Sequence, residues 1–392
     1  MTSTFDEIDE VEVKSQPQIR LTTTALVGYA ALVMLVVLGF LFGGEGASFA
    51  QTGLTFLPFL VIAVLAYLGI RYPAARVLAV LWLFSLLGIY ILVVAGFSVM
   101  ATVDLNAVFE DATPDPALLS TVMSTGGLAV VALLVALLGF IPAVRRGISP
   151  LLPRDPHSFV NTNAQVSETA MLLMSYVPLI VLGQPPLLSD AMLDAVQESQ
   201  MTGTSGLLAQ VYTMVWTVPV AIFAVGFGIR RSLRETFARL GFVAPSLRQV
   251  LIGVGAALLM VLAMNVLDVG LTWLWQTMGW PQTDAEAFGE LLAFALSPLG
   301  AVVIGVTAGL GEELGVRGVL QPRLGILLSN LFFTSLHAFQ YNWDSLLVVF
   351  LLGTIFGVLR KYTNTSTAAI THGLYNFLTV MMSLYGISLL GN

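Results

Sequence analysis

Apolar stretches of about 20 residues, separated by short polar linkers, run through almost the whole sequence. An α-helix of that length crosses the hydrocarbon core of a bilayer. Charged residues make up only 10% of the chain, whereas soluble domains carry about 25%. We therefore predict an all-α fold, a polytopic transmembrane helical bundle of about 11 membrane segments. The predicted segments are 22–43, 52–70, 77–100, 126–144, 169–184, 207–229, 249–275, 292–321, 326–341, 345–360 and 366–387.

Three of these segments are irregular. The fifth (169–184) and the ninth (326–341) are short for a spanning helix, which is typical of a tilted or re-entrant segment. Ser297-Pro298 interrupts the eighth segment, so its membrane part is expected to begin at Pro298.

Basic residues are confined to alternate linkers, and this pattern predicts the orientation. The linkers between them hold acidic residues and no Lys or Arg. Because basic residues concentrate on the cytoplasmic side, we predict a multi-pass protein of the cell membrane with a cytoplasmic N-terminus. The basic linkers lie near residues 71–76, 145–154, 230–248, 317–323 and 360–361, and the acidic linkers near 104–115, 190–198 and 284–290.

The sequence divides into three regions. Residues 1–21 are predicted to form an acidic cytoplasmic tail, and residues 22–184 an N-terminal transmembrane region of unknown role. Residues 205–390 contain the candidate catalytic groups. Cysteine is absent, which excludes disulfides, a thiolate nucleophile and a zinc–thiolate site. The basic residues form no single patch, so the expected partners are membrane lipids and a membrane-associated peptide or protein, and not nucleic acid.

Polar side chains of catalytic type gather in the C-terminal region. Two of the chain's three histidines, His337 and His372, follow the adjacent pair Glu312-Glu313. Insertion scales put the cost of one charged side chain at the centre of a bilayer at about 2.5 to 3.5 kcal/mol. Packing alone does not explain several such groups, so a catalytic site inside the membrane is predicted.

The spacing of these groups predicts different tasks for them. Adjacent glutamates on an α-helix point about 100° apart, and Glu313 can pair with Arg317 one turn later, which leaves Glu312 free to face a cavity. His372 and Asn376 share one face of the last helix. Counted from the cytoplasmic helix ends, the first glutamate and the two histidines lie about 15, 16 and 9 Å deep. The three helices are therefore expected to converge on one chamber that is open to the cytoplasm.

A carboxylate and two imidazoles around a buried water suit the hydrolysis of a peptide bond. Glu312 is the expected general base, and His337 is expected to help hold the water. His372 and Asn376 are expected to donate hydrogen bonds to the oxyanion that forms on the scissile carbonyl. The neighbouring glutamate–arginine pair is expected to fix the helix that presents the base.

The same motifs resemble those of a known family. Glu-Glu-x-x-x-Arg, Phe-x-x-x-His and His-x-x-x-Asn, in this order between residues 311 and 377, are similar to the motifs of the CPBP intramembrane proteases. That family includes the CAAX prenyl endopeptidase and Abi-type bacterial proteins. The similarity covers residues 205–390, and residues 1–200 match no part of the family pattern. It implies a CAAX-prenyl-protease-like intramembrane endopeptidase.

The resemblance also implies roles for individual residues. It assigns the activation of water to Glu312 together with His337. It assigns the stabilisation of the oxyanion to His372 and Asn376. The family often has an aromatic residue before the arginine, where this chain has Val316, a departure that affects packing more than chemistry.

The residues leave open whether a metal takes part. Glu312, His337 and His372 can be read as a three-ligand site for a divalent metal such as zinc, with a fourth position open to water. The His-Glu-x-x-His pair of common zinc proteases is absent. A metallopeptidase and a peptidase with glutamate-activated water predict nearly the same residues.

Two other functions fit the same residues. A non-catalytic immunity or assembly factor would keep the scaffold without cleaving a substrate. A proton-coupled transporter would use the glutamate and histidines as a relay, but it would be expected to show repeat symmetry between its halves, and none is evident. Unchanged function in a Glu312→Gln variant would favour the non-catalytic factor.

Overall fold

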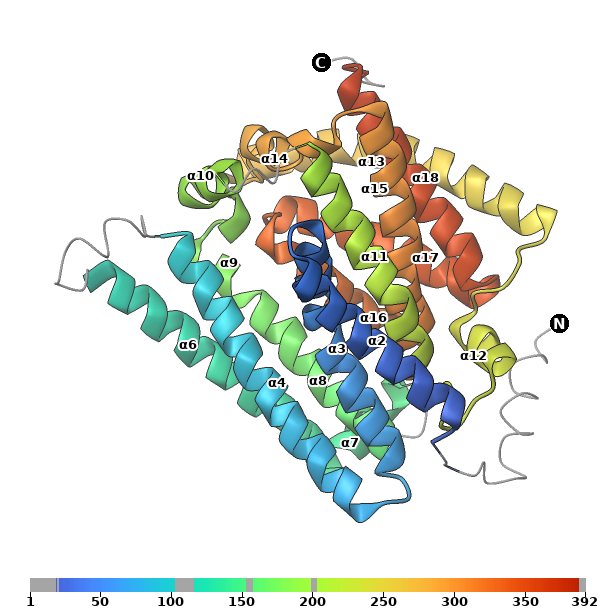
Figure 1. The fold of residues 1–392 in the computed structure, drawn as a ribbon. Coiled ribbons are helices and arrows are strands. Elements are labelled where there is room, and N and C mark those ends of the chain that lie inside the picture. Colours follow the sequence, from blue (N-terminus) through green and yellow to red (C-terminus); the bar gives the residue numbers. More distant parts are fainter. Residues whose placement is uncertain (1–18, 20, 103–115, 153–157, 199–202, 388–392) are drawn as a thin grey trace.

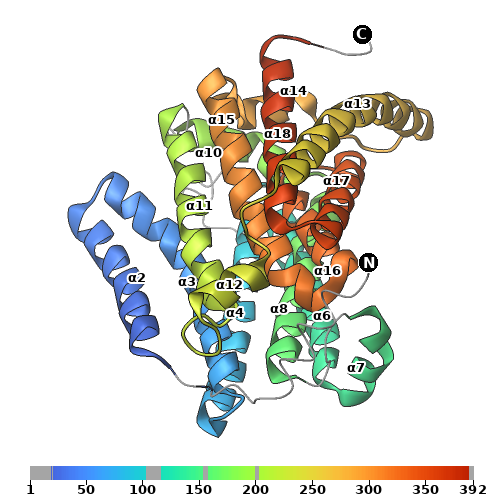
Figure 2. The same ribbon diagram turned by 90° about the vertical axis from the view of Figure 1, so that its right-hand side faces the viewer.

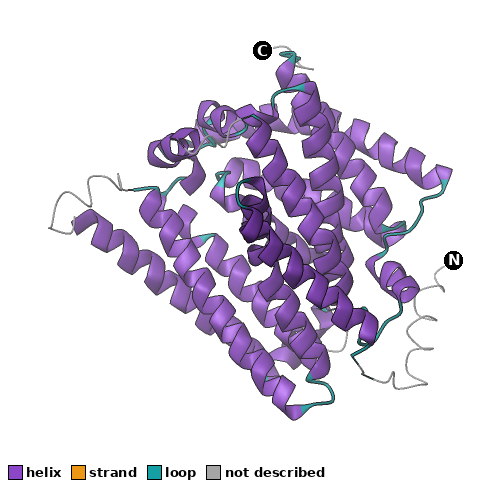
Figure 3. Ribbon diagram, viewed as in Figure 1, coloured by secondary structure: helices purple, strands orange, loops and turns teal. Residues whose placement is uncertain are grey.

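The computed structural model describes residues 19, 21–102, 116–152, 158–198 and 203–387 (Figure 1). The described chain is helical and contains no strand beyond one isolated bridge, between Phe227 and Arg231 (Figure 3). The all-α prediction is therefore confirmed. The predicted acidic tail lies outside the described residues except for Ile19 and Leu21, and so do most residues of the first acidic linker.

Each predicted membrane segment corresponds to helical structure. The long helices are α2 (Thr23–Phe42), α3 (Glu45–Leu68), α4 (Pro73–Met100), α6 (Pro116–Leu137), α8 (Phe159–Ser175), α11 (Thr204–Ala224), α13 (Leu247–Met278), α15 (Pro298–Thr307), α16 (Gln321–Leu336), α17 (Trp343–Tyr362) and α18 (Thr365–Leu384). Shorter helices are α7 (Pro142–Ile148), α9 (Val177–Leu182), α10 (Asp190–Glu198), α12 (Leu233–Leu240) and α14 (Ala285–Leu291). Two further segments, η5 (Ala308–Glu312) and η6 (Leu314–Leu320), join α15 to α16.

Nine helical stretches of the described chain are long and apolar enough to cross a membrane, which makes this a multi-pass membrane protein. The prediction of about 11 segments agrees roughly with this number. One of the nine stretches, Pro298–Phe339, contains both α15 and α16. Helix α18 is not among them, because polar residues such as His372 and Asn376 lower its hydropathy.

The fifth predicted segment, 169–184, starts too late. Helix α8 begins ten residues earlier, at Phe159, and α9 continues from it beyond Tyr176. The first turns of α8 carry polar side chains, so their hydropathy is too low to indicate a membrane helix. Asn163 and Glu168 are nevertheless buried inside the protein. The eighth segment behaves as predicted, since α15 begins at Pro298.

The linkers with basic residues lie together at one end of the bundle. Arg323 Nη2 donates a hydrogen bond to the hydroxyl of Tyr67 (2.7 Å), and the backbone N–H of Thr365 donates to the carbonyl of Gly241 (2.9 Å). Further contacts at this end join Arg71 to Ile19, Arg76 to Phe159, Arg239 to Gly318 and Thr22 to Gly228. Helix ends that are far apart in sequence therefore share this face.

Two of the acidic linkers meet at the opposite end. The Asp344 carboxylate accepts hydrogen bonds from the backbone N–H and the hydroxyl of Thr283 (3.0 and 2.7 Å). Leu188 and Leu193 pack against Ala287, so that α10 lies on α14 (Figure 1). The alternation read from the sequence is thus an alternation between two ends of the molecule; that the basic end is cytoplasmic stays a prediction.

The N-terminal and C-terminal helices pack against each other along α8 and α16, and along α3 and α11 (Figures 1 and 2). In the C-terminal part, α13 runs obliquely across α18 (Figure 2). The segment from α15 to η5 crosses α18 at close range, because a Cβ at Gly305 or Gly309 would lie 2.6 Å from a carbonyl oxygen of α18. Small residues commonly allow such close crossings in membranes.

Candidate active site

The adjacent glutamates lie where two π-helical segments meet. Glu312 ends η5, and Glu313 immediately precedes η6. The sequence predicts a regular α-helix here, and the structure differs; glycines such as Gly309, Gly311 and Gly315 lower the helix propensity. The two side chains nevertheless have different surroundings, as predicted, because that of Glu313 is fully buried and that of Glu312 is 42% exposed.

The carboxylate of Glu313 lies between two nitrogen groups. Its Oε2 is 3.5 Å from Arg317 Nε, and its Oε1 is 3.0 Å from His372 Nδ1. The predicted pair with Arg317 is therefore confirmed. The contact with His372 was not predicted; it ties α18 to the junction of η5 and η6.

Arg317 is held from several sides. Its Nη2 donates a hydrogen bond to the carbonyl of Gly353 (2.8 Å), and its guanidinium lies 4.8 Å from the ring centroid of Phe333 and 5.8 Å from that of Phe356. A Cβ at Gly353 would overlap Asn330 Oδ1 and lie 3.0 Å from Arg317 Nη2. Only glycine therefore leaves room for the guanidinium in its present place.

His372 has a defined orientation. Its ring stacks on Phe356, with centroids 4.4 Å apart and planes 20° apart. Because a carboxylate can only accept, the proton on Nδ1 is the one donated to Glu313. The other nitrogen, Nε2, is 3.3 Å from Asn376 Nδ2 and 4.0 Å from Glu312 Oε2. The predicted shared face of His372 and Asn376 is thus a direct contact.

Glu312 and His337 line the same cavity, which has a volume of about 660 Å³. His372 and Asn376 are not among its lining residues. His372 Nε2 lies 4.0 Å behind Glu312 Oε2, and Asn376 contacts that same nitrogen. The walls come from α3, α8 and α11 as well as from η5, η6 and α16. The chamber is therefore built by both halves of the chain, although the sequence suggests no role for the N-terminal half.

The tautomer of His337 follows from its contacts. Its Nδ1 is 2.9 Å from the backbone carbonyl of Phe333, which can only accept, so Nδ1 carries the proton. In the neutral ring, Nε2 is then an acceptor. Phe333 meets the ring edge-on at 4.7 Å, and Tyr341 lies parallel to it at 6.1 Å. Phe333 also lies 6.2 Å from the ring of His372, so one phenyl ring separates the two imidazoles.

The predicted metal ligands are not gathered into one group. Among the described residues, no three His, Asp or Glu side chains lie close enough together to hold a metal ion. Glu312 and His337 face the cavity, whereas His372 lies against Glu313. The present arrangement of the described residues does not fit a three-ligand zinc site, and the metal stays a prediction from the sequence.

Two polar residues of α8 line the chamber, and the sequence analysis missed them. Glu168 and Asn163 face it from the N-terminal half. The assumed start of the fifth segment at residue 169 placed both in a polar linker. If the helix had been predicted from Phe159 onward, Glu168 would have been a carboxyl group inside a membrane helix. Such a group indicates a functional site.

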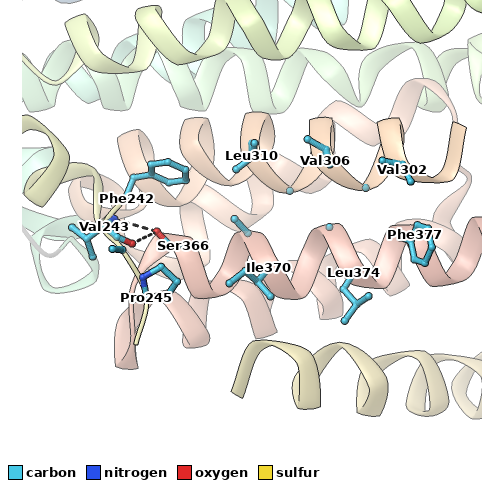
Figure 4. A pocket seen from close by; sticks show the side chains of 15 residues that line it. Phe242, Val243, Pro245, Val302, Val306, Leu310, Ser366, Ile370, Leu374 and Phe377 are labelled. Carbon is cyan, nitrogen blue, oxygen red and sulfur yellow. Dashed lines mark hydrogen bonds between the residues drawn. The ribbon is translucent and has the colours of Figure 1, made fainter. Parts of the chain in front are cut away.

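A second cavity, of about 650 Å³, lies between α15 and α18 beside the linker after α12. Its walls are apolar, with Val306, Ile370 and Phe377 among them (Figure 4). Ser366 is a polar lining residue, and its hydroxyl is engaged with the backbone of Val243 (2.6 and 3.1 Å). No titratable side chain lines this groove, so its described walls offer no acid–base group.

A comparison with protein families gives a match, and it covers the residues of this site. Residues 294–378 match the family model described as type II CAAX prenyl endopeptidase Rce1-like. This segment contains all three motifs, and the match confirms the resemblance to CPBP proteases. At the level of the family, this part of the chain is similar to the domain of a CAAX-protease-like endopeptidase. No curated protein and no solved structure matches the chain.

Proposed function

We propose that this protein hydrolyses a peptide bond of a membrane-associated substrate, with a water activated by Glu312 and His337. One observation above all supports the proposal. Glu312 and His337 line one cavity, while the buried contact of Glu313 with His372 holds a second imidazole 4.0 Å behind Glu312. A base, a water-holding acceptor and a group of hydrogen-bond donors are thus available within one site.

In the proposed first step, Glu312 acts as the general base. Its carboxylate takes a proton from water while the water oxygen forms a bond to the scissile carbonyl carbon. His337 Nε2, unprotonated because Nδ1 donates to Phe333, accepts a hydrogen bond from the second proton of that water. The carbonyl π electrons move to oxygen and create the oxyanion.

Asn376 and His372 are the proposed partners of the oxyanion. Asn376 donates through Nδ2, and His372 donates through Nε2 when the ring carries both protons. Both groups lie behind Glu312, so its side chain must turn toward His337 to admit the carbonyl oxygen. Its 42% exposure provides the space for that rotation.

In the second step the tetrahedral intermediate collapses. The oxyanion re-forms the carbonyl, the C–N bond breaks, and the leaving nitrogen takes the proton held by Glu312. The products are a carboxylic acid and an amine, and the base is regenerated. Throughout, Glu313 and Arg317 would keep His372 in place, which is a positioning role.

The substrate class follows from the site's surroundings. The family description names a CAAX prenyl endopeptidase, which acts on a lipid-bearing protein tail, and the chamber lies within a membrane bundle. Entry from the basic end would make the substrate a cytoplasmic one under the positive-inside rule. We propose a peptide tail or precursor held at the membrane, with or without a prenyl group.

The test is a Glu312→Gln variant in proteoliposomes and in cells. We expect loss of peptide cleavage by at least about 10²-fold, with expression and thermal unfolding unchanged. Membrane proteomics should show a precursor that accumulates in the variant. Asp268→Asn, a carboxyl change in α13 away from the chamber, is the matched control. Full cleavage by Glu312→Gln would overturn the proposal.

Metal analysis separates the two ways of activating water. The purified protein is assayed for bound zinc and for cleavage after dialysis against a chelator. A metal-free route predicts full activity without metal. One equivalent of zinc that is lost in Glu312→Gln, together with activity that zinc restores, would instead establish the three-ligand site.

A further inference from the structure

The chamber contains a buried carboxyl that the proposed mechanism does not use. Glu168, on α8, is 4% exposed, and its Oε1 has no hydrogen-bond partner among the described residues. One and a half turns earlier, Asn163 is 2% exposed, and its Oδ1 is likewise without a partner in the described chain. Buried polar atoms are nearly always hydrogen-bonded in proteins, so two such atoms on one wall require an explanation.

Both unpartnered atoms are placed to accept hydrogen bonds. One N–H of the Asn163 amide donates to the carbonyl of Phe159 (2.9 Å), which fixes the side chain with its unpartnered oxygen as an acceptor. The carboxyl group of Glu168 can only accept when it is ionised, and a bound cation would favour that form. A ligand that satisfies this wall must therefore bring N–H donors, and a cationic group would also neutralise the buried carboxylate.

The lining residues of the chamber offer no cation to Glu168. Arg323 is the one basic side chain, lysine or arginine, among the described lining residues. It already donates to the Tyr67 hydroxyl (2.7 Å) and the Ala224 carbonyl (3.2 Å). The other acidic lining residue is Glu312. The described walls thus have an excess of acidic groups and would attract a positively charged ligand.

Glu168 lies at the depth of the proposed chemistry. Nine residues separate it from Phe159 at the basic end, which corresponds to about 14 Å along the helix. Glu312 lies ten residues before Pro322 at the same end, and both carboxyl groups line the same chamber. Because α8 packs against α16, and His337 directly follows α16, a ligand can reach both walls at once.

We propose that Glu168 and Asn163 form a subsite that binds a cationic side chain, lysine or arginine, of the peptide substrate near its scissile bond. The identity of the ligand as a peptide rests on the proposed function. The subsite itself comes from α8, outside the segment 294–378 that matches the protease family. It gives the N-terminal helices a role in selecting the substrate.

The experiment uses pairs of membrane-anchored peptides that differ at one position, lysine against norleucine, which has the same stem without the charge. The position is moved along both sides of the cleaved bond, and kcat/KM is measured for the full-length protein in proteoliposomes. We expect the lysine peptide to be preferred by about tenfold or more at one position. Glu168→Gln should bring the ratio of kcat/KM for the lysine and norleucine peptides close to one.

Two controls make the result specific. Asp268→Asn should keep the lysine preference, since that carboxyl lies outside the chamber. Peptides with acetylated and free N-termini distinguish a side-chain cation from a terminal amine. If Glu168→Gln slows both peptides equally, or if the wild type shows no preference at any position, the subsite is overturned while the protease proposal stands.

A binding arm keeps the subsite testable if no peptide is cleaved. The same peptide pairs, carrying a photoreactive group, are crosslinked to Glu312→Gln and to the double variant Glu168→Gln/Glu312→Gln. Preferential labelling of the first protein by the lysine peptide, lost in the second, supports the subsite even if the protease proposal has failed. Equal labelling of both proteins by both peptides, or no labelling, overturns it.

Discussion

Two buried carboxyl groups, one in each half of the molecule, have opposite surroundings. Glu313 is fully buried and contacts Arg317 at 3.5 Å and His372 at 3.0 Å. Glu168 is 4% exposed, and its Oε1 has no partner among the described residues. The first carboxyl group lies between two nitrogen groups of its own protein, whereas no such contact is found for the second among the described residues. The two halves of the molecule therefore treat a buried carboxyl group differently: the C-terminal half pairs it, and the N-terminal half leaves it facing the chamber.

The largest expected effect comes from breaking the contacts of Glu313 with Arg317 and His372. Glu313→Gln leaves the guanidinium of Arg317 and the ring of His372 buried without their carboxylate. Loss of one member of a buried ion pair typically costs about 3 to 5 kcal/mol. We expect that loss in the free energy of unfolding, with peptide cleavage abolished. Chemical unfolding in detergent micelles, followed by tryptophan fluorescence, measures it.

Glu168→Gln is the matched change in the other half. It replaces a buried carboxyl group whose Oε1 has no partner among the described residues, so stability should stay within about 1 kcal/mol of wild type or rise. If the two variants lose equal stability, the contrast between the two carboxyl groups is wrong. Circular dichroism at matched protein concentrations checks that both variants are folded.

The next prediction compares two asparagines. Asn376→Ala removes a proposed donor to the oxyanion, and losses of about 10² to 10³ in kcat follow from the removal of one such donor. Asn163→Ala removes an acceptor on the opposite wall and should raise KM for lysine peptides with little change in kcat. Initial rates over a range of peptide concentrations separate the two parameters. A fall in kcat for both variants alike would contradict the division of roles.

Helix contacts differ between the halves as well. Gly353→Ala brings a Cβ onto Asn330 and to within 3.0 Å of Arg317, so we expect a loss of about 1 to 3 kcal/mol and reduced activity. Gly88, inside α4, has nothing within 4 Å of the same position. Gly88→Ala should therefore be neutral or stabilising by up to about 1 kcal/mol. Equal losses in the two variants would contradict the idea of a tightly packed catalytic half.

The sequence was sufficient for the features that depend on local patterns. Apolar stretches predicted the helices, and alternate basic linkers predicted which helix ends lie together. The four-residue spacings predicted the contact of Glu313 with Arg317 and that of His372 with Asn376. Each of these follows from the geometry of a single helix.

Features that depend on packing between helices were not predictable in this way. The contact of Glu313 with His372 joins residues 59 positions apart. The walls of the chamber come from helices of both halves, and no periodicity within one helix specifies its neighbour. Glu168 was missed for a related reason, because burial inside the protein allows polar residues in a helix that hydropathy excludes from lipid.

The smallest expected effect concerns the caps of two helices, one in each half. At α12, Ser232 accepts from the N–H of Glu235, whose carboxylate accepts in return from the N–H of Ser232 (2.7 Å). At α2, Thr22 accepts from the N–H of Ala25 (3.2 Å). Removal of either cap, by Ser232→Ala or Thr22→Ala, should cost about 1 kcal/mol.

Only the cap at α12 should affect cleavage. Leu240 of α12 packs on Leu314, and Arg239 donates to the carbonyl of Gly318 (3.0 Å), so α12 supports η6 directly. The hydrogen bond from the backbone N–H of Ser232, and then that from its hydroxyl, lower the pKa of the Glu235 carboxyl below its ordinary value of 4.5. The carboxylate's contribution to this cap is therefore complete above that value and is lost as the pH falls through the lowered pKa, whereas the hydrogen bond from the Glu235 N–H to the Ser232 hydroxyl remains. The difference in thermal unfolding between wild type and Ser232→Ala should therefore narrow in that acidic range, and a constant difference would show that the hydrogen bond between the Ser232 hydroxyl and the carboxylate does not contribute.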